Sequence, residues 1–187
     1  MEKQECSNCG EYKDKQDFVR RNQTMNICQE CQETIGLSAP VTGAASEYFA
    51  LGSLLLSYPD TMLASHATSA HDLIIHLDRG INIRTQVKTA RSSIPLKGGT
   101  RGGADRADGH GKDKSFRYTS DRCDLIIGVQ FSSFPHFDLF FLPSLVVDKL
   151  EQQSISINKI SFTKNDIQIV EHCLDETYAE EYLQKIN

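Results

Sequence analysis

The spacing of apolar residues predicts a mixed α/β protein whose main domain begins with a helix. In AASEYFALGSLLLS, residues 44–57, apolar residues recur at helical intervals, so we expect a helix that Thr42 caps. Tyr58-Pro59 should end this helix, because the residue before a proline disfavours helical geometry. Leu51, Leu54 and Leu55 share a face with Glu47. TMLASHA, residues 61–67, then fits a first short strand.

The segment from His71 to Lys88 predicts a β-hairpin. Apolar and β-branched residues fill both arms, and Asp78-Arg79-Gly80 supplies the turn. If the arms pair symmetrically about residue 79, Asp72 lies opposite Gln86. Because side chains alternate between the faces of a strand, Asp72, Gln86 and Lys88 then converge on one face. A slip of one residue would send the partner side chains to the other face.

The remaining pattern predicts two core strands, DLIIGVQF (124–131) and FDLFFLP (137–143), followed by shorter elements. We expect a helix over 144–153 and an edge strand over 154–162. Thr163 to Asp166 fits a capping box that opens a helix to about Leu174, and an acidic helix should follow Asp175. The expected fold is α/β, with a mixed sheet flanked by helices.

Four of the six cysteines form two CxxC pairs that 18 residues separate: Cys6, Cys9, Cys28 and Cys31. Two such pairs can complete a tetrahedral site, so we expect a structural Zn²⁺ ion. A disulfide pair or a redox CxxC are the alternatives; the first is disfavoured inside cells, and the second needs only one pair. Cys123 and Cys173 are expected to be buried apolar residues.

These motifs divide the chain into a zinc-binding module at 1–36, a linker at 37–43 and a main domain at 44–187. The linker is inferred from a stretch rich in Gly, Ala, Ser and Pro. No apolar run approaches the roughly 20 residues of a membrane span. The N-terminus lacks the layout of a secretory signal, so we expect an intracellular protein with no membrane contact.

The net charge of −5 hides a strong asymmetry. Residues 79–122 carry eleven Lys and Arg against four Asp, whereas every other part of the chain is acidic. Within this block, residues 92–117 are rich in glycine and lack an apolar period, which indicates a long loop. A polyanion would be attracted to it, although a solvated surface loop would look the same. Its candidate phosphate contacts are Lys97, Arg101, Arg106, Lys112, Lys114 and Arg117.

Three pieces of the main domain together resemble a known enzyme family. They are Glu47, Asp72-Leu-Ile-Ile, and Arg84-Thr-Gln-Val-Lys-Thr-Ala90. This arrangement resembles the PD-(D/E)XK nuclease superfamily, in the branch where Gln replaces the second acid, which includes group I intron homing endonucleases and restriction-like enzymes. The likeness covers roughly residues 42–150. The cysteine segment resembles zinc-binding segments at the N-termini of phage and bacterial nucleases.

The resemblance implies a restriction-endonuclease-like fold and a role for each motif residue. Asp72 would be the main ligand of Mg²⁺, with the Val87 carbonyl and the Gln86 side-chain oxygen as further ligands. Glu47 would bind metal or hold a water. Lys88 would orient or help deprotonate the attacking water. Gln86 departs from the Glu of the commonest pattern, and a neutral amide binds a metal ion more weakly than a carboxylate does.

The function expected from these features is that of a Mg²⁺-dependent, site-specific DNA endonuclease of the homing or restriction type, in a bacterial or phage setting. Its partner would be double-stranded DNA, and cutting both strands favours a homodimer or homotetramer. A structure-specific junction or repair nuclease is one alternative. A non-catalytic zinc-containing DNA-binding protein on a nuclease fold, or a zinc-stabilised protein-interaction module, are the others.

Overall fold

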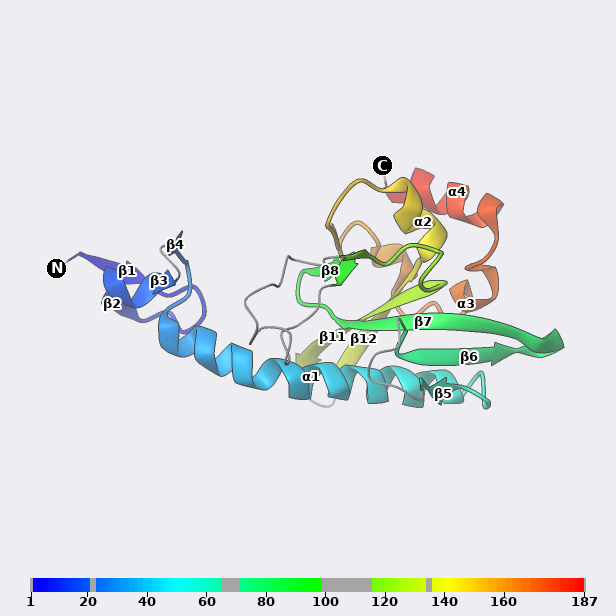
Figure 1. Cartoon of the computed structure of the whole chain (residues 1–187), viewed down its shortest axis with the longest axis horizontal. Coiled ribbons are helices and arrows are strands. Elements are labelled where there is room, and N and C mark those ends of the chain that lie inside the picture. The colour runs from blue at the N-terminus through cyan, green and yellow to red at the C-terminus, as the bar shows by residue number, and fades with distance from the viewer. Residues whose placement is uncertain (1, 21–22, 65–70, 99–115, 134–135, 187) are drawn as a thin grey trace, which may run out of the picture. The chain divides into compact units, whose positions relative to one another are not determined.

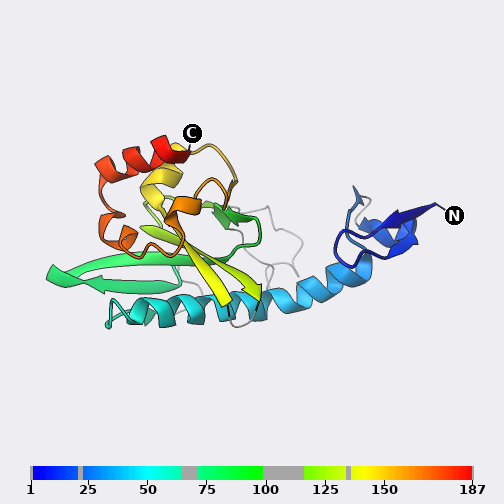
Figure 2. The same ribbon diagram turned by 180° about the vertical axis from the view of Figure 1, so that it is seen from behind.

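The computed structural model describes residues 2–20, 23–64, 71–98, 116–133 and 136–186 (Figures 1 and 2). The chain divides into two compact units, Met1–Ala44 and Ala45–Asn187. The long helix α1, Gln29–Leu55, contributes residues to both units. Each unit has its own buried core, so each is described by itself.

The first unit consists of short strands around a small core. Strand β1, Lys3–Glu5, pairs with β2, Tyr12–Asp14, and β3, Val19–Arg20, pairs with β4, Gln23–Thr24. A 3-10 turn, Lys15–Phe18, joins the two pairs. The side chains of Cys6, Phe18 and Cys28 form the core, so cysteines make up most of the buried side chains.

Helix α1 begins earlier than the sequence predicted. The predicted start at Thr42 is wrong, and residues 37–43, expected to form an irregular linker, are helical. The helix instead starts beside the second cysteine pair, where the N–H of Gln32 donates to the carbonyl of Cys28 (2.9 Å). Pro40 lies inside the helix, where its ring removes a single backbone donor. The Gly and Pro residues of this segment led to the prediction of a linker, but the loss of one backbone hydrogen bond does not break the helix.

A five-stranded mixed sheet forms the centre of the second unit, in the order β12-β11-β7-β6-β5 (Figure 1). Its strands are β5 (Met62–Leu63), β6 (Leu73–Leu77), β7 (Ile81–Thr89), β11 (Leu125–Ser133) and β12 (His136–Pro143). All neighbours are antiparallel except β7 and β11, which are parallel. The predicted α/β class, with a mixed sheet flanked by helices, is confirmed.

The predicted hairpin register is also confirmed. Leu73 pairs with Thr85 and Leu77 pairs with Ile81, so the arms are symmetric about residue 79. The turn is a 3-10 element, Asp78–Gly80, in which Gly80 has a φ of 75°, a value that glycine adopts without strain. The first strand predicted at 61–67 shortens to β5, and residues 65–70 lie outside the described residues.

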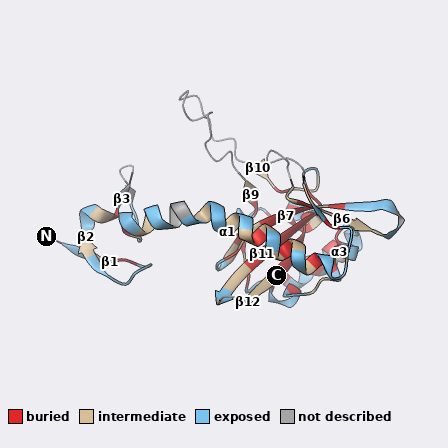
Figure 3. Ribbon diagram, turned by 90° about the horizontal axis from the view of Figure 1, so that it is seen from below, coloured by how far each residue is buried: buried red, intermediate tan, exposed pale blue. Residues whose placement is uncertain are grey.

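The core of the second unit lies on both faces of the sheet. Buried residues are concentrated in β11, in the second half of β12 and in the middle of β7, and Figure 3 shows buried stretches of the sheet in red. Ala50 and Leu54 of α1 cover one face, and α2 (Ser144–Lys149) and α4 (Glu176–Ile186) lie on the other (Figure 2). A Cβ on Gly128 would lie 2.4 Å from Cδ1 of Ile94, so close packing requires glycine there. Because β11 is an interior strand between β12 and β7, its near-continuous apolar sequence matches burial on both faces of the sheet.

After residue 153, hydrogen bonds to other strands replace much of the predicted secondary structure. The predicted strand over 154–162 shortens to β13, Ser154–Ser156, which pairs with β8, Ser93–Pro95. The helix predicted to open at Thr163 is wrong. Asn165 has a φ of 56° and bonds the edge of β12 in both directions, its N–H donating to the Leu139 carbonyl (2.7 Å) and its Oδ1 accepting from the Leu139 N–H (2.8 Å).

Only a short helix, α3, Ile169–His172, forms in this region. Helix α2 ends at Lys149, so the helix predicted over 144–153 is shorter than expected. The acidic helix predicted after Asp175 is confirmed as α4, and the Asp175 carboxylate accepts from the N–H of Thr177 (2.8 Å) as an N-cap. A 3-10 turn, Ser161–Thr163, and a small ribbon of β9, Lys97–Gly98, and β10, Phe116–Arg117, complete the described elements. Among the described residues, no helix has the length and apolar character needed to cross a membrane.

Candidate active site

Asp72 lies at the entrance to strand β6 and is bonded to β7 by its backbone and its side chain. Its N–H donates to the Thr85 carbonyl (2.8 Å), which continues the hairpin ladder by one step. Its Oδ2 accepts from the N–H of Val87 (2.7 Å) and from the side-chain amide of Gln86. The facing of Asp72 and Gln86 that the hairpin symmetry predicted is therefore present.

Gln86 is 5% exposed, and its side-chain amide fills the space between two oxygens. Nε2 donates to Asp72 Oδ2 and lies 3.4 Å from the Val87 carbonyl oxygen. These two oxygens are the ones expected to bind a metal ion, and in this structure both face one electropositive group. The amide nitrogen, rather than the expected amide oxygen, points to Asp72. Turning the terminal amide would present that oxygen, so the site can offer carboxylate, carbonyl and amide oxygens, the donors that Mg²⁺ prefers.

Glu47, Asp72 and Lys88 share one electrostatic environment. Burial and the Asp72 charge raise the pKa of Glu47, and Lys88 opposes them. Burial raises the pKa of Asp72, against the Val87 N–H and the charges of Lys88 and His71. Two partly buried carboxyls with raised pKa values, of which Asp72 disfavours the ionisation of Glu47, lie near a lysine in an arrangement that a divalent cation would stabilise. The structure thus brings together the four residues selected from the sequence.

A hydrogen bond between α1 and β7 keeps the acid and the lysine in register. Ser46 Oγ and Thr89 Oγ1 lie 2.7 Å apart, and Ser46 is 1% exposed. Each hydroxyl belongs to the immediate sequence neighbour of a site residue, Glu47 on the helix and Lys88 on the strand. The Lys88 Nζ atom also lies 4.5 Å from the centroid of the Tyr118 ring. Sequence reasoning did not select Tyr118.

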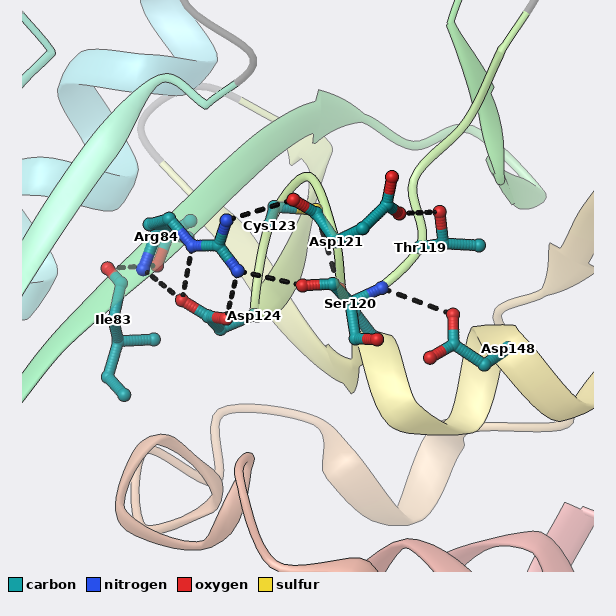
Figure 4. Close-up of polar contacts among 10 residues, drawn as sticks. Ile83, Arg84, Thr119, Ser120, Asp121, Cys123, Asp124 and Asp148 are labelled. Atoms are coloured by element: carbon teal, nitrogen blue, oxygen red, sulfur yellow. Dashed lines mark hydrogen bonds and ion pairs between the residues drawn. The ribbon is translucent and has the colours of Figure 1, made fainter.

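Sequence reasoning also missed an arginine-centred network at the start of β7 and β11 (Figure 4). The Arg84 guanidinium forms an ion pair with the Asp124 carboxylate (2.7 Å) and donates to the carbonyls of Ser120 (2.7 Å) and Asp121 (3.0 Å). Both charged residues belong to predicted strand regions of the sequence: Arg84 lies within β7 and Asp124 directly precedes β11, and the parallel register sets Leu125 opposite Thr85. Recognising the network required knowing that these two strands are parallel neighbours.

The predicted DNA contacts have different outcomes. Arg101, Arg106, Lys112 and Lys114 lie outside the described residues. Lys97 lies in β9 and is partly exposed, which suits a phosphate contact. Arg117 is a correction: its guanidinium donates to the carbonyls of Val147 (2.8 Å) and Leu150. These carbonyls end helix α2 and its flank, so Arg117 satisfies helix-terminal acceptors rather than facing a ligand.

The first unit contains a separate candidate metal centre. The Sγ atoms of Cys6, Cys9, Cys28 and Cys31 all lie within 4.8 Å of one another. Gly10, with a φ of 73°, turns the first pair, and its N–H donates to the Cys6 carbonyl (2.8 Å). Four clustered thiols fit the tetrahedral thiolate set that Zn²⁺ takes in closed structural sites.

The environment of Cys6 favours its thiolate form. Burial opposes ionisation, but the backbone N–H groups of Cys28, Cys9 and Asn8 outweigh it and lower the pKa of Cys6 to about 6. The N–H of Cys28 lies 3.3 Å from the Cys6 sulfur. In contrast, Cys123 and Cys173 are buried in the second unit, as expected, and burial raises the pKa of their thiols to about 11 and about 12.

No protein-family model matches the sequence, and no curated protein sequence matches it. Among solved structures, the chain is similar to a bacterial homing endonuclease, I-Ssp6803I, with a TM-score of 0.48 and 12% sequence identity. The similarity covers 64% of this chain and 77% of that one. The function is therefore argued from the residues of this chain.

Proposed function

We propose that the chain is a Mg²⁺-dependent DNA endonuclease whose catalytic groups are Glu47, Asp72, Gln86 and Lys88. The observation that carries the proposal is that the charge of Lys88 acts on both Glu47 and Asp72, two partly buried carboxyls with raised pKa values, and that Asp72 also acts on Glu47. Glu47 belongs to α1, Asp72 directly precedes β6, and Lys88 belongs to β7, so the proposed site draws on three parts of the fold. Perturbed carboxylates gathered in this way are typical of sites that work on charged substrates.

Asp72, Gln86 and the Val87 carbonyl would hold Mg²⁺ in this proposal. When bound, such an ion polarises a phosphoryl oxygen and lowers the pKa of a coordinated water. The Val87 N–H bond to Asp72 orients the carboxylate before any ligand arrives (2.7 Å), so no side-chain freedom is lost on binding. Displacing the Gln86 amide nitrogen from Asp72 would free the same carboxylate oxygen.

Lys88 and Glu47 would act on the water and the phosphate. The Lys88 ammonium offsets the negative charge that grows on the phosphate in the transition state, and it can orient the attacking water. Glu47 binds a second position of the cation or holds a water for attack. Its raised pKa makes it a better proton acceptor than an exposed carboxylate once it is ionised.

The cysteine cluster would hold a structural Zn²⁺ ion, which defines residues 1–36 as a zinc-binding module and 44–187 as the nuclease domain. Four thiolates leave no open coordination position, so this ion would do no chemistry. Double-stranded DNA would be the substrate, with Lys97 and the basic segment near it as phosphate contacts. A site-specific enzyme of the homing or restriction type, acting as a homodimer or homotetramer, is the form we propose, because a double-strand cut needs two active sites.

A plasmid cleavage assay with Mg²⁺ tests this function. Wild-type protein should convert supercoiled plasmid to nicked and linear forms, and both Asp72→Asn and Lys88→Met should lower the rate by about 10²-fold or more. The matched controls are Asp78→Asn, an exposed acid at the turn of the same hairpin, and Lys149→Met, an exposed lysine on α2; both should cleave at the wild-type rate.

Two outcomes would contradict the proposal. One is wild-type protein that binds duplex DNA and cleaves none of a broad set of plasmids and genomic DNA with Mg²⁺ or Mn²⁺. That result would favour a zinc-containing DNA-binding protein. The other is normal cleavage by both variants, which would leave nuclease activity standing but move the active site elsewhere.

A further inference from the structure

Tyr118 is a buried aromatic residue that contacts the proposed catalytic lysine. Its ring centroid lies 4.5 Å from Lys88 Nζ, and Tyr118 is 5% exposed. An ammonium over the face of an aromatic ring is attracted by the ring quadrupole, and the attraction grows when water is excluded. The contact therefore falls in the range where such an interaction restrains a flexible side chain.

The segment that carries Tyr118 is held on both sides by arginines. Before it, Arg117 donates to the Val147 carbonyl of α2 (2.8 Å). After it, Arg84 donates to the Ser120 and Asp121 carbonyls (2.7 and 3.0 Å; Figure 4). Ser120 is further tied to α2, since its N–H donates to Asp148 (3.1 Å). Arg84 belongs to β7, the strand that also carries Lys88, so one strand presents the lysine and secures the segment that presents the ring.

Gly98 provides the space that the Tyr118 ring occupies. A Cβ at Gly98 would lie 2.4 Å from the Tyr118 hydroxyl oxygen and 2.7 Å from Cζ of Phe116. Phe116 and Tyr118 meet edge to face, with centroids 5.4 Å apart at 83°. The Tyr118 N–H donates to the carbonyl of the buried Leu96 (3.0 Å). The hydrogen bond to Leu96, the Phe116 ring and the space at Gly98 together confine the Tyr118 ring beside Lys88.

We infer that Tyr118 is a positioning residue that holds the Lys88 ammonium in place for catalysis, an inference that rests on the proposed function of Lys88. A lysine side chain has four rotatable bonds and loses much conformational entropy when it is fixed. The ring attracts Lys88 through its quadrupole and leaves the ammonium charged. The ammonium therefore reaches the phosphate both localised and charged.

Graded fluorination of the ring tests the inference through kcat. Phenylalanine and 3,4,5-trifluorophenylalanine at position 118 keep the shape of the ring, but fluorine withdraws the electron density that attracts a cation. We expect Tyr118→Phe to keep kcat within about twofold, and the trifluorinated ring and Tyr118→Leu to lower it by about three- to tenfold, with KM for DNA unchanged. A purely structural role for the ring would leave kcat insensitive to fluorination.

A spectroscopic measurement tests the contact without using activity. In protein labelled with ¹³C at the lysine ε carbons, the Lys88 signal, identified by its loss in Lys88→Arg, should be shifted upfield by the ring current. The shift should persist in Tyr118→Phe and disappear in Tyr118→Leu. Tyr182→Leu serves as a matched control, because Tyr182 is an equally buried tyrosine whose hydroxyl donates to the Phe141 carbonyl (2.7 Å). It should lower the melting temperature without changing kcat or the Lys88 shift.

The outcomes separate this inference from the proposed function. Wild-type protein that never cleaves DNA overturns the proposed function, whatever the Lys88 signal shows. Wild-type protein that cleaves, with kcat unchanged by Tyr118→Leu and by the trifluorinated ring, overturns the positioning role alone. An unshifted Lys88 signal in wild-type protein overturns the contact on which the inference rests.

Discussion

At the scale of single residues, the ionised carboxylate of Asp72 lowers the free energy of unfolding. Burial is the largest influence on its carboxyl and raises its pKa, despite the Val87 N–H and two nearby positive charges. A carboxyl with a raised pKa binds a proton more tightly in the folded state than in the unfolded state. The free energy of unfolding therefore falls as pH rises from the ordinary value of 3.8 through the raised pKa. At neutral pH the folded protein carries this cost in full.

Replacing this carboxylate should therefore stabilise the protein while removing its proposed activity. Asp72→Asn keeps an oxygen that can accept from the Val87 N–H but carries no charge. We expect a higher free energy of unfolding than wild type at neutral pH, and a difference that shrinks as pH falls toward 3.8. Urea denaturation followed by circular dichroism at several pH values measures both.

The control variant Asp78→Asn, at the exposed turn, should have the same free energy of unfolding as wild type. Adding Mg²⁺ should stabilise wild type and leave Asp72→Asn unchanged, because ligand binding to the folded state adds to stability. A variant less stable than wild type at neutral pH would mean that the hydrogen bonds of Asp72 outweigh its desolvation.

At the scale of elements, the Arg84 network joins the strands that bracket the site. The arginine belongs to β7, its carboxylate partner Asp124 directly precedes β11, and the carbonyls it binds lie between Tyr118 and that strand (Figure 4). The planar guanidinium reaches Asp124 through two nitrogens while also binding two carbonyls. An ammonium has no such fork, so lysine cannot replace it here.

Arg84→Lys should therefore destabilise the second unit although it conserves charge. Losing several charge-assisted hydrogen bonds at a partly exposed site should cost about 1–3 kcal/mol in the free energy of unfolding. Arg91→Lys, an exposed arginine just after β7, is the control and should change it by less than about 0.5 kcal/mol. Equal stability of the two variants would show that the Arg84 contacts contribute nothing net.

At the scale of the whole molecule, the two units differ in what stabilises them. The second unit buries apolar side chains on both faces of its sheet. The first buries Cys6, Phe18 and Cys28, two of which are expected metal ligands. So small an apolar core seldom holds a fold by itself, and metal binding then supplies the folding free energy.

Removing the metal should thus unfold the first unit and leave the second folded. In a full-length sample loaded with Zn²⁺, a strong chelator or Cys6→Ser should make the backbone before residue 28 sensitive to protease, while 45–187 keeps its unfolding midpoint. Cys173→Ser, which alters a buried cysteine of the second unit, should leave the zinc content at one ion per chain. A first unit that resists protease without metal would contradict a folding role for zinc.

Sequence patterns carried much of the site because its central pieces are local. Two CxxC pairs identify the cysteine cluster, and a hairpin with a short turn has one register that keeps Ile75 and Ile83 buried. Asp72 and Gln86 therefore face each other for reasons visible within 15 residues of chain. Glu47 came from a family resemblance, since nothing local connects α1 to the hairpin.

Two of the three predictions that failed depended on long-range contacts. Pro40 and its neighbouring glycines are compatible with a linker or with a helix, and the chain forms a helix. Thr163–Asp166 carries a helix-start signal, but the exposed edge of β12 takes Asn165 as a hydrogen-bonding partner. Arg117 was selected for its charge, and α2 brought two carbonyls to it. For Asn165 and Arg117, a partner far away in sequence decided between two locally acceptable states.

The chain's own periodicity determined the mixed α/β class, the hairpin register and the cysteine cluster, because each depends on spacing along a short segment. Only the tertiary structure decided which charged residues are engaged by other parts of the protein and which can contact a ligand. It joined Arg84 to Asp124 across parallel strands, engaged Arg117 at α2, and set the Tyr118 ring beside Lys88. The physical reason is that a charged side chain takes whichever partner the packed core brings within reach, and the core is assembled from segments that no local pattern connects.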